Sequence, residues 1–396
     1  MEENKDRKYA YWLDNIPGVG DKTIQYLLSV EDSPERIYKD FTDRSLKAEE
    51  HISEKYGRGK AMIQKIRTHA CQWQPEREYE SLEQKGIRFF SVKDDEYPWR
   101  LKMIPDPPFG LYAKGKLPKD HILSVAVIGA RECSEYGRYV GTELGKSLGA
   151  SGVQVISGMA RGIDGISQRA ALEAGGTSFG VLGCGVDVCY PAQNRELYEK
   201  LPVQGGILSA NPPGTLPKAS LFPPRNRIVS GLSDVVIVVE ARQKSGTLIT
   251  VDMALEQGRE VYVVPGRLTD RLSDGCNKLM KQGAGILLSP EAFLQEMRET
   301  FQEKMPDAGK KVHTPVEIES EGTEPEEEKT DKDDIERQWE HEIYKQLDLT
   351  PLSTEQIRQA VGGKLSYMKL RQILMQLCLS GKIKQASPGF YSREKP

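Results

Sequence analysis

The sequence contains no long hydrophobic run. No segment of its 396 residues approaches the ~20 consecutive apolar residues that a transmembrane helix needs. The N-terminal stretch MEENKDRKYA is mostly charged and has no apolar centre of the kind found in a secretory signal peptide. We therefore expect a cytoplasmic protein with no membrane partner.

Motifs for metals and cofactors are also missing. The six cysteines are scattered, without a CxxC pair or a neighbouring histidine, which argues against a zinc site and a disulfide framework. Neither the dinucleotide fingerprint GxGxxG nor the phosphate-binding motif GxxxxGKS occurs, which disfavours NAD and ATP chemistry. The prediction is a protein that uses no cofactor and no metal ion.

Catalytic side chains are sparse in the middle of the chain, where no histidine lies between His121 and His313. The acidic residues that are candidates for a general base or a metal ligand lack the paired spacing of a metal-dependent nuclease. They are Asp164, Asp187, Asp234, Glu240 and Asp252. Asp234, Glu240 and Asp252 are interpreted as turn and helix-start residues. We therefore assign no catalytic residue and predict a binding protein, not an enzyme.

The N-terminal residues 1–75 have helical patterns with polar faces. Within them, IPGVG in the stretch NIPGVGDKTIQYLL is typical either of a helix-hairpin-helix turn or of an ordinary turn between two helices. Asp21, directly after this turn, can cap the next helix. We predict a small helical domain of the SAM or helix-hairpin-helix kind.

The C-terminal quarter changes composition twice. Residues 301–337 are acidic, poor in apolar residues and without periodicity, so we predict a disordered linker. Residues 338–396 give three amphipathic helical stretches and a hairpin-like KIKQASPGFYSR, the pattern of a winged helix. The third stretch, from Ser366, carries Lys369 and Arg371 beside a broad apolar face, so duplex binding and protein interaction both stay open.

Residues 76–300 follow an α/β pattern. Between 123 and 290, six short apolar runs from LSVAVIGA to EVYVVPG alternate with stretches of helix length. This alternation is the signature of a parallel sheet covered by helices on both faces. Apolar runs between 76 and 120 predict further strands. The predicted fold class is therefore an extended Rossmann-like, doubly wound parallel sheet.

Basic and hydroxyl residues gather in the loops beside these runs. Sheets of this kind bind ligands outside the carboxyl ends of their strands. SGMARGID (157–164) has the glycine, the helix start and the Asp164 of an anion nest, and RQKSGTLIT (242–250) repeats the pattern; helix capping alone also explains either loop. The arginines expected at this edge are Arg131, Arg161, Arg225, Arg227 and Arg242. The whole chain has a net charge of −3, so a basic surface can only be local. The expected convergence of these arginines at one edge favours a local site for a polyanion.

Several motifs, taken together, resemble one family. VAVIGAR, SGMARGIDGISQRAALEAGG, GVLGCGVDVCYP, FPPRNRIVSGLSD and ALEQGREVYVVPG occur in the order and spacing of DNA processing protein A (DprA, also called Smf) over residues 80–300. The resemblance implies a bacterial protein that binds single-stranded DNA, dimerises through its Rossmann domain and helps load the RecA recombinase during natural transformation. Arg131 matches the arginine of the family's GSR motif, and Phe222, Arg225 and Arg227 match its FPxRNR segment.

The resemblance and the loop residues together define the expected DNA site. In it, Arg225 and Arg227 are expected to grip successive phosphates from a proline-stiffened stretch, while Phe222 offers a ring to a base. The full set is Arg131, Ser157, Gly158, Arg161, Lys218, Phe222, Arg225, Asn226, Arg227, Lys244, Ser245, Gly246 and Thr247. The apolar segment LMKQGAGILL (279–288) is either part of a dimer interface or the last helix and strand of the core.

This chain departs from the family's pattern at four places. Gln168 stands where relatives usually have His, Ala192 where many have Lys, and Ser209-Ala210-Asn211-Pro212 replaces SEYP. Ala219 holds a position where some relatives carry a lysine, which Lys218 replaces only in part. These changes bear on affinity and not on the fold. Two other functions stay open: a hydrolase of nucleoside monophosphates, and a duplex-binding winged-helix regulator.

Overall fold

The computed structural model describes most of the first 305 residues and parts of the C-terminal region. The described residues are 3–43, 54–56, 60–305, 339–340, 342–347, 352–362, 370, 373–374, 376–378, 380, 382–387 and 390–393. The chain divides into two units, Met1–His313 and Thr314–Pro396. Within the part of the chain described, no helix is both long and apolar enough to cross a bilayer.

Helices form the N-terminal part of the first unit. The IPGVG turn joins α1 to α2, and its Gly18 has a φ of 72°, which a side chain would strain. The predicted capping of α2 by Asp21 is wrong, because Asp21 is the first residue of that helix and Gly20 occupies the N-cap position. The Asp21 carboxylate instead accepts a hydrogen bond from the backbone N–H of Phe109 (3.2 Å). The helices are α1 (Glu3–Asp14), α2 (Asp21–Val30), α3 (Pro34–Thr42), α5 (Lys60–Gln72) and α6 (Pro75–Gln84).

One hydrophobic core joins these helices to the sheet. Trp12 of α1 and Tyr79 of α6 are buried in the same cluster as Phe89 and Tyr112 of the first two strands. The rings of Phe89 and Tyr112 lie 5.2 Å apart, within the range of favourable aromatic pairs. The predicted boundary after residue 75 therefore does not coincide with a break in the core.

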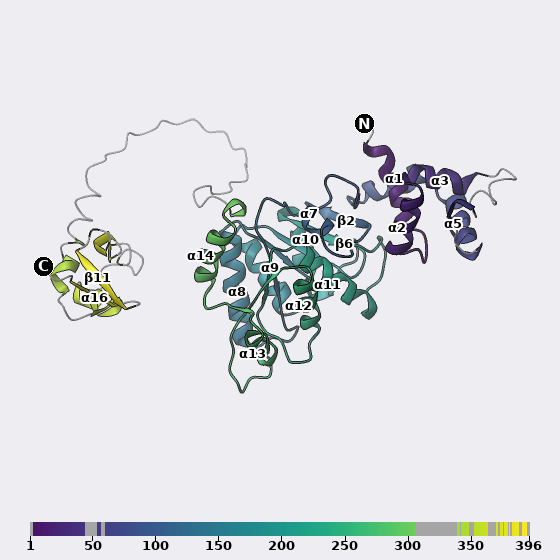
Figure 1. Ribbon diagram of the computed structural model, residues 1–396. Coiled ribbons are helices and arrows are strands. Elements are labelled where there is room, and N and C mark those ends of the chain that lie inside the picture. Colours follow the sequence, from purple (N-terminus) through teal and green to yellow (C-terminus); the bar gives the residue numbers. More distant parts are fainter. Residues whose placement is uncertain are drawn as a thin grey trace, which may run out of the picture. The chain divides into compact units, whose positions relative to one another are not determined.

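The sheet has the predicted Rossmann-like architecture (Figure 1). All six runs between 123 and 290 are strands, and they pair in parallel in the order β6-β5-β4-β3-β7-β8, with the short β9 at the far edge. β1 and β2 add an antiparallel pair beside β6. The strands are β1 (Arg88–Ser91), β2 (Gly110–Gly115), β3 (Ser124–Ile128), β4 (Gln154–Ser157), β5 (Ser178–Val181), β6 (Gly206–Ser209), β7 (Val235–Val238), β8 (Glu260–Val263) and β9 (Gly285–Ile286).

Helices cover both faces of the sheet. Side chains alternate along a strand, so Val125 and Val127 of β3 face one layer while Ala126 and Ile128 face the other. The first layer contains α8, α9 and α14, and the second contains α7, α11, α12 and α13. The helices are α7 (Trp99–Lys102), α8 (Glu135–Ala150), α9 (Ile163–Glu173), α10 (Arg195–Gln204), α11 (Phe222–Gly231), α12 (Gly246–Glu256), α13 (Asp274–Lys281) and α14 (Pro290–Thr300).

A buried ion pair holds the amino end of β7. Asp234 lies directly before this strand, and its carboxylate accepts hydrogen bonds from Arg100 Nε (3.0 Å) and from the backbone N–H of Ser124 (3.0 Å). Lys304 Nζ adds a third contact at 2.7 Å, and its carbonyl accepts from Leu123 N (2.8 Å). Residues 301–305 therefore pack on the sheet domain, although the sequence places them in the linker.

The second unit contains a small antiparallel sheet. β10 (Leu352–Ser353), β12 (Phe390–Arg393) and β11 (Ile383–Ser387) pair in that order, and α16 (Thr354–Ala360) follows β10. Ile343, Ile357 and Leu374 belong to its apolar core. Ser366, Lys369 and Arg371 of the predicted third helix lie outside the described residues, as does most of the predicted linker.

Asp14, at the end of α1, has a half-buried carboxyl group close to Tyr112. It accepts a hydrogen bond from Tyr112 Oη (2.6 Å), which also accepts one from Asn15 Nδ2 (2.8 Å). Burial raises the pKa of Asp14 to about 7, against the opposing effect of the hydrogen bond from Tyr112. The folded protein therefore holds a proton here at pH values where the unfolded chain has released it.

We predict that Asp14→Asn changes the pH dependence of stability. Because the folded-state pKa is raised, the free energy of unfolding falls as pH rises from about 4 to about 7. At about pH 8 the amide should stabilise the fold by about 1–3 kcal/mol, and at about pH 4 the difference should vanish. Urea unfolding at both pH values measures this, with the exposed Asp95→Asn as control. Equal stability of Asp14→Asn and wild type at the higher pH would contradict the assignment.

Candidate nucleic-acid interface

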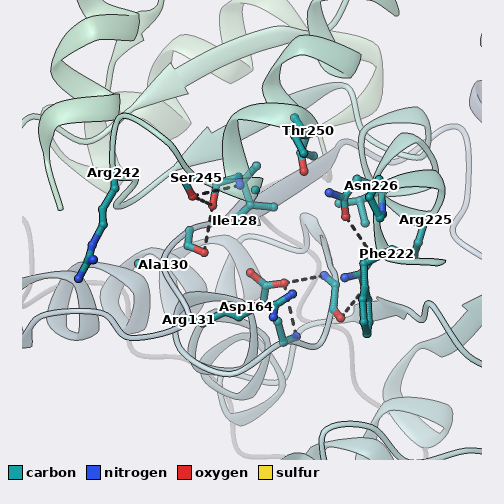
Figure 2. A pocket seen from close by; sticks show the side chains of 18 of the residues that line it. Ile128, Ala130, Arg131, Asp164, Phe222, Arg225, Asn226, Arg242, Ser245 and Thr250 are labelled. Carbon is teal, nitrogen blue, oxygen red and sulfur yellow. Dashed lines mark hydrogen bonds between the residues drawn. The ribbon is translucent and has the colours of Figure 1, made fainter. Parts of the chain in front are cut away.

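A cavity of about 740 Å³ lies at the carboxyl edge of the parallel sheet. From β3 the chain builds outward to β4, β5 and β6 on one side, then returns to build β7, β8 and β9 on the other. The loops after β3 and β7 therefore diverge and leave a crevice between them. This main cavity is lined by the loops after β3, β4 and β7 and by the first turn of α11, as Figure 2 shows for Arg131, Asp164, Phe222 and Ser245.

The loop after β4 has the predicted nest geometry, but its own carboxylate already fills the nest. Asp164 accepts hydrogen bonds from the backbone N–H groups of Gly158 (3.1 Å) and Ala160 (3.4 Å). Burial raises the pKa of Asp164, while the nearby Arg225 guanidinium opposes that rise. Ser157 is fully buried and donates its hydroxyl to the Val127 carbonyl (2.6 Å). Ser157 and Gly158 therefore stabilise the conformation of the loop through these hydrogen bonds.

The proline-stiffened FPPRNR stretch is helical. It forms the start of α11, with Pro223 and Pro224 in the first turn, where a missing backbone N–H costs no helical hydrogen bond. On a helix, residues three apart share a face whereas residues two apart do not. Phe222 and Arg225 therefore lie together, and Arg225 and Arg227 point in different directions.

Arg225 is a buried side chain at the floor of the main cavity. Its side chain is 7% exposed, and its Nη1 donates to the carbonyls of Gly158 (2.6 Å) and Val181, at the ends of β4 and β5. A Cβ on Gly158 would lie 2.6 Å from this nitrogen, so only glycine allows the contact. Burial lowers the pKa of Arg225, and the carboxylate of Asp164 opposes that change. The guanidinium thus places a positive charge under the cavity floor.

Phe222 lines both the main cavity and a smaller one of about 370 Å³, here called the side cavity. Its ring centroid lies 5.6 Å from the Arg131 guanidinium, 5.8 Å from that of Arg225 and 5.7 Å from the Tyr190 ring. Gly183 leaves room for the ring, because a Cβ there would lie 2.9 Å from Phe222 Cδ1. The result is an aromatic surface flanked by cations.

Exposed cations surround the main cavity. Arg131, Arg242 and Lys244 line it and are solvent-exposed, while Arg161 is exposed at the side cavity. Glu132 also lines the main cavity, so the rim is not uniformly basic. Lys218 is exposed but belongs to neither lining. The sequence therefore identifies most of the charged rim correctly by position.

The hydroxyl groups of the SGT loop before α12 form hydrogen bonds within the protein. The Ser245 hydroxyl accepts a hydrogen bond from the backbone N–H of Thr247 (3.2 Å), and the Thr247 hydroxyl donates to the Gly129 carbonyl (3.3 Å). Gly246 is exposed, and a Cβ there would meet nothing within 4 Å. Ser245, Gly246 and Thr247 all line the main cavity. The hydroxyls of Ser245 and Thr247 fix the loop that carries Lys244.

Arg227 lies outside both cavities. Its Nη2 pairs with Asp21 of α2 at 3.0 Å, and its Nη1 pairs with Asp106. Its neighbour Asn226 does line the main cavity, and the Asn226 side-chain oxygen accepts a hydrogen bond from Arg225 Nε (3.2 Å). The structure therefore does not bring Arg225 and Arg227 together on one ligand. Arg227 instead links the helix that carries Phe222 to the N-terminal helices.

The acidic residues considered as bases have structural partners or lie elsewhere. Glu240 is buried and accepts hydrogen bonds from the backbone N–H (2.9 Å) and the hydroxyl of Ser134, which connects the end of β7 to the start of α8. Asp187 accepts from Gly214 N (2.8 Å), and Asp252 is exposed on α12. Within the described residues, no group of acidic, histidine and cysteine side chains is arranged to hold a metal ion.

Two of the family departures lie at the cavities. Ala219 lines the main cavity and Ala192 the side cavity, whereas Gln168 is buried and donates to the Ser178 hydroxyl (3.1 Å). The sequence interpretation missed Tyr190, which lines both cavities, and Leu272, which reaches the main cavity from the loop after β8. Tyr190 lies between β5 and Pro191, so the rule that ligands bind beyond the carboxyl ends of the strands could have identified it.

Comparison with known proteins gives a consistent match. The family model described as DNA recombination-mediator protein A matches residues 88–298. The DNA processing protein DprA of Bacillus subtilis is 41% identical over 220 residues, which are 54% of this chain and 73% of the relative. Protein Smf of Synechocystis is 35% identical over 296 residues, 73% of this chain and 72% of its own length.

A solved structure supports the same assignment. The X-ray structure of DNA processing protein A from Streptococcus pneumoniae has 34% sequence identity and a TM-score of 0.60 to this chain. The match covers 73% of this chain and 97% of that one. With the parallel sheet, the cavity at its switch point and the matched family model, the chain belongs to the DNA recombination-mediator protein A family, also known as DprA or Smf.

Proposed function

We propose that this protein binds single-stranded DNA in the main cavity and acts as a recombination mediator without catalysing a reaction itself. The observation that carries the proposal is Phe222, whose ring centroid lies 5.6 Å from the Arg131 guanidinium and 5.8 Å from that of Arg225 at the sheet's carboxyl edge. Proteins that bind single strands without sequence preference combine aromatic faces for the bases with a basic groove for the backbone. The cavity offers both features.

The charge distribution supports a single strand over a free nucleotide. Arg131, Arg242 and Lys244 are spread over the loops after two neighbouring strands and all are exposed. A mononucleotide carries its charge at one position, whereas a strand presents phosphates along its length. The nest after β4, where a single phosphate would otherwise bind, is filled by Asp164. A polyanion therefore suits the rim better.

The same contacts disfavour a nucleoside monophosphate hydrolase. Of the five acids singled out in the sequence, only Asp164 lines the main cavity. Its carboxylate organises a loop, and Glu240 is bonded to Ser134 away from the lining. A general base must reach the proton or water it activates. A non-enzymatic role is therefore the proposal.

The partners follow from family membership and are part of the proposal. We expect the protein to act in the cytoplasm on strands taken up during natural transformation, to load RecA recombinase on them and to work as a homodimer. A winged helix in the second unit would add a further contact for DNA or protein. A binding assay of the intact protein with RecA, with and without a single strand, tests the recombinase interaction.

Phe222→Ala and Arg131→Ala should weaken single-strand binding in different ways. Loss of a stacking ring costs about 1–3 kcal/mol per base and releases no counterion, so the salt slope should stay constant. Loss of one phosphate contact should lower the slope of log K against log salt by about 0.7. Fluorescence titrations over a salt series measure both quantities, with the exposed Arg298→Ala in the last turn of α14 as control. Identical slopes for Arg131→Ala and wild type would rule out a phosphate contact.

Arg227→Ala should act on stability and leave the salt slope unchanged. The variant removes the ion pairs with Asp21 and Asp106, of which the latter is largely exposed, so we expect a loss of about 1–2 kcal/mol in the free energy of unfolding. Urea melts and salt titrations on the same preparation separate the two effects. If a folded Arg227→Ala lost as much slope as Arg131→Ala, the guanidinium would have to leave its carboxylates for a phosphate.

The proposed dimer should depend on the exposed half of residues 279–288. Leu279 and Leu287 are buried in the core, but Ile286 on the edge strand β9 is 49% exposed and Leu288 is 81% exposed. Replacing Ile286 and Leu288 together by Lys should convert the dimer to monomer in sedimentation velocity. Val203→Lys, at an exposed apolar residue of α10, is the control. A wild-type protein that stays monomeric at micromolar concentration would remove the proposal.

A further inference from the structure

A second exposed surface borders the main cavity and has no role in the contacts described so far. It consists of Tyr136 and Tyr139 on the first turns of α8, and of Arg267, Leu268 and Arg271 in the loop between β8 and α13. We call it the tyrosine–arginine surface. Tyr139 is 67% exposed and Leu268 is 90% exposed.

The two elements are joined to each other and to the cavity. The Tyr136 hydroxyl donates to the Pro265 carbonyl (3.1 Å) at the end of β8, so α8 and the β8 loop are neighbours. Leu272, one residue after Arg271, lines the main cavity. β8 lies two strands from β3, about 10 Å across the sheet. The tyrosine–arginine surface therefore continues the cavity along the same edge of the sheet.

The loop that presents the arginines is held in place by its own hydrogen bonds. Asn277 Nδ2 donates to the Gly266 carbonyl (3.3 Å), and the Leu272 carbonyl accepts from the backbone N–H of Ala241 (2.8 Å). The Asp270 carboxylate accepts from Leu272 N (2.9 Å). Leu268 thus remains exposed on a loop anchored at both ends, so its exposure is built into the fold.

The charges of this surface are available to a ligand. Among the described residues, neither Arg267 nor Arg271 has a carboxylate within ion-pair distance, whereas Arg138, on the same turn as the tyrosines, pairs with Glu135 at 3.6 Å. Two guanidinium groups and an exposed leucine on this loop, with two exposed tyrosines on the neighbouring helix, combine charge for a backbone with flat faces for unpaired bases. A duplex keeps its bases stacked inside and would leave the tyrosines unused.

We propose that a single strand bound in the main cavity continues over the tyrosine–arginine surface, with Arg267 and Arg271 on its phosphates and Tyr139 against a base. The inference rests on the proposed function, since it extends the site that holds Phe222. It assigns to this surface the nucleotides outside the cavity, and it makes affinity depend on strand length. A protein partner on the same surface is the competing occupant.

Strand length separates this surface from the cavity. With an oligothymidylate of about 4 nucleotides, the low end of single-strand site sizes, Arg267→Ala/Arg271→Ala should bind like wild type, because the proposal places so short a strand in the main cavity. With a strand of about 16 nucleotides, the double variant should lose about 1.4 in salt slope and bind at least about ten-fold more weakly. The control is Arg77→Ala/Arg298→Ala, which removes two exposed arginines from α6 and α14. It should bind both strands like wild type.

Tyr139 provides an independent readout. Tyr139→Ala should weaken binding of the longer strand by about five-fold or more with an unchanged salt slope, and Tyr139→Phe, which keeps the ring, should restore it. Unaltered binding of the longer strand by Arg267→Ala/Arg271→Ala would overturn the inference and leave the cavity assignment intact, and would favour a protein partner. Failure of wild type to bind either strand would instead overturn the proposed function.

Discussion

The candidate site depends on one buried guanidinium. Arg225 donates to the carbonyls at the ends of β4 and β5, lies beside Asp164 and supports the ring of Phe222. A buried charge is costly unless it is hydrogen-bonded and compensated. Here the carbonyls at the strand ends and the Asn226 side chain accept hydrogen bonds from the guanidinium, and the Asp164 carboxylate compensates its charge. The arrangement fixes an aromatic ring at the sheet edge and adds positive potential beneath it.

The rest of the site follows from the topology of the sheet. Parallel strands send all their carboxyl ends to one edge, and the divergence between β3 and β7 opens the cavity there. At the opposite edge, the Asp234 carboxylate accepts hydrogen bonds from Arg100 and Lys304. These contacts connect β7 to α7 and to residues 301–305. Structural ion pairs thus occupy the amino edge, while the exposed cations gather at the carboxyl edge. The proposed single-strand site uses this separation.

The sequence predicts the sheet well because its strands are short, continuous apolar runs, which is what burial on both faces requires. It predicts the place of the exposed loop cations by a different argument, because loops that follow parallel strands meet at the carboxyl edge of the sheet. It fails where side-chain direction matters. Nothing in the sequence distinguishes the roles of Arg225 and Arg227. Because they are two residues apart on a helix, they face different partners: Arg225 lies at the cavity floor, and Arg227 pairs with Asp21 and Asp106. The two prolines of this stretch lie in the first turn of α11, where a missing backbone N–H costs no helical hydrogen bond. The partners Asp164 and Asp106 of these arginines come from distant parts of the chain, which local patterns do not reveal.

The central claim is that a single strand lies against Phe222 between the cations of the carboxyl edge. Photo-cross-linking of the intact protein to a strand that carries iodouracil, with the modified peptides mapped by mass spectrometry, tests it most directly. The account predicts cross-links at the aromatic residues of the cavity, Phe222 and Tyr190. Cross-links confined to the second unit, Thr314–Pro396, with none in the loops that line the cavity, would contradict it.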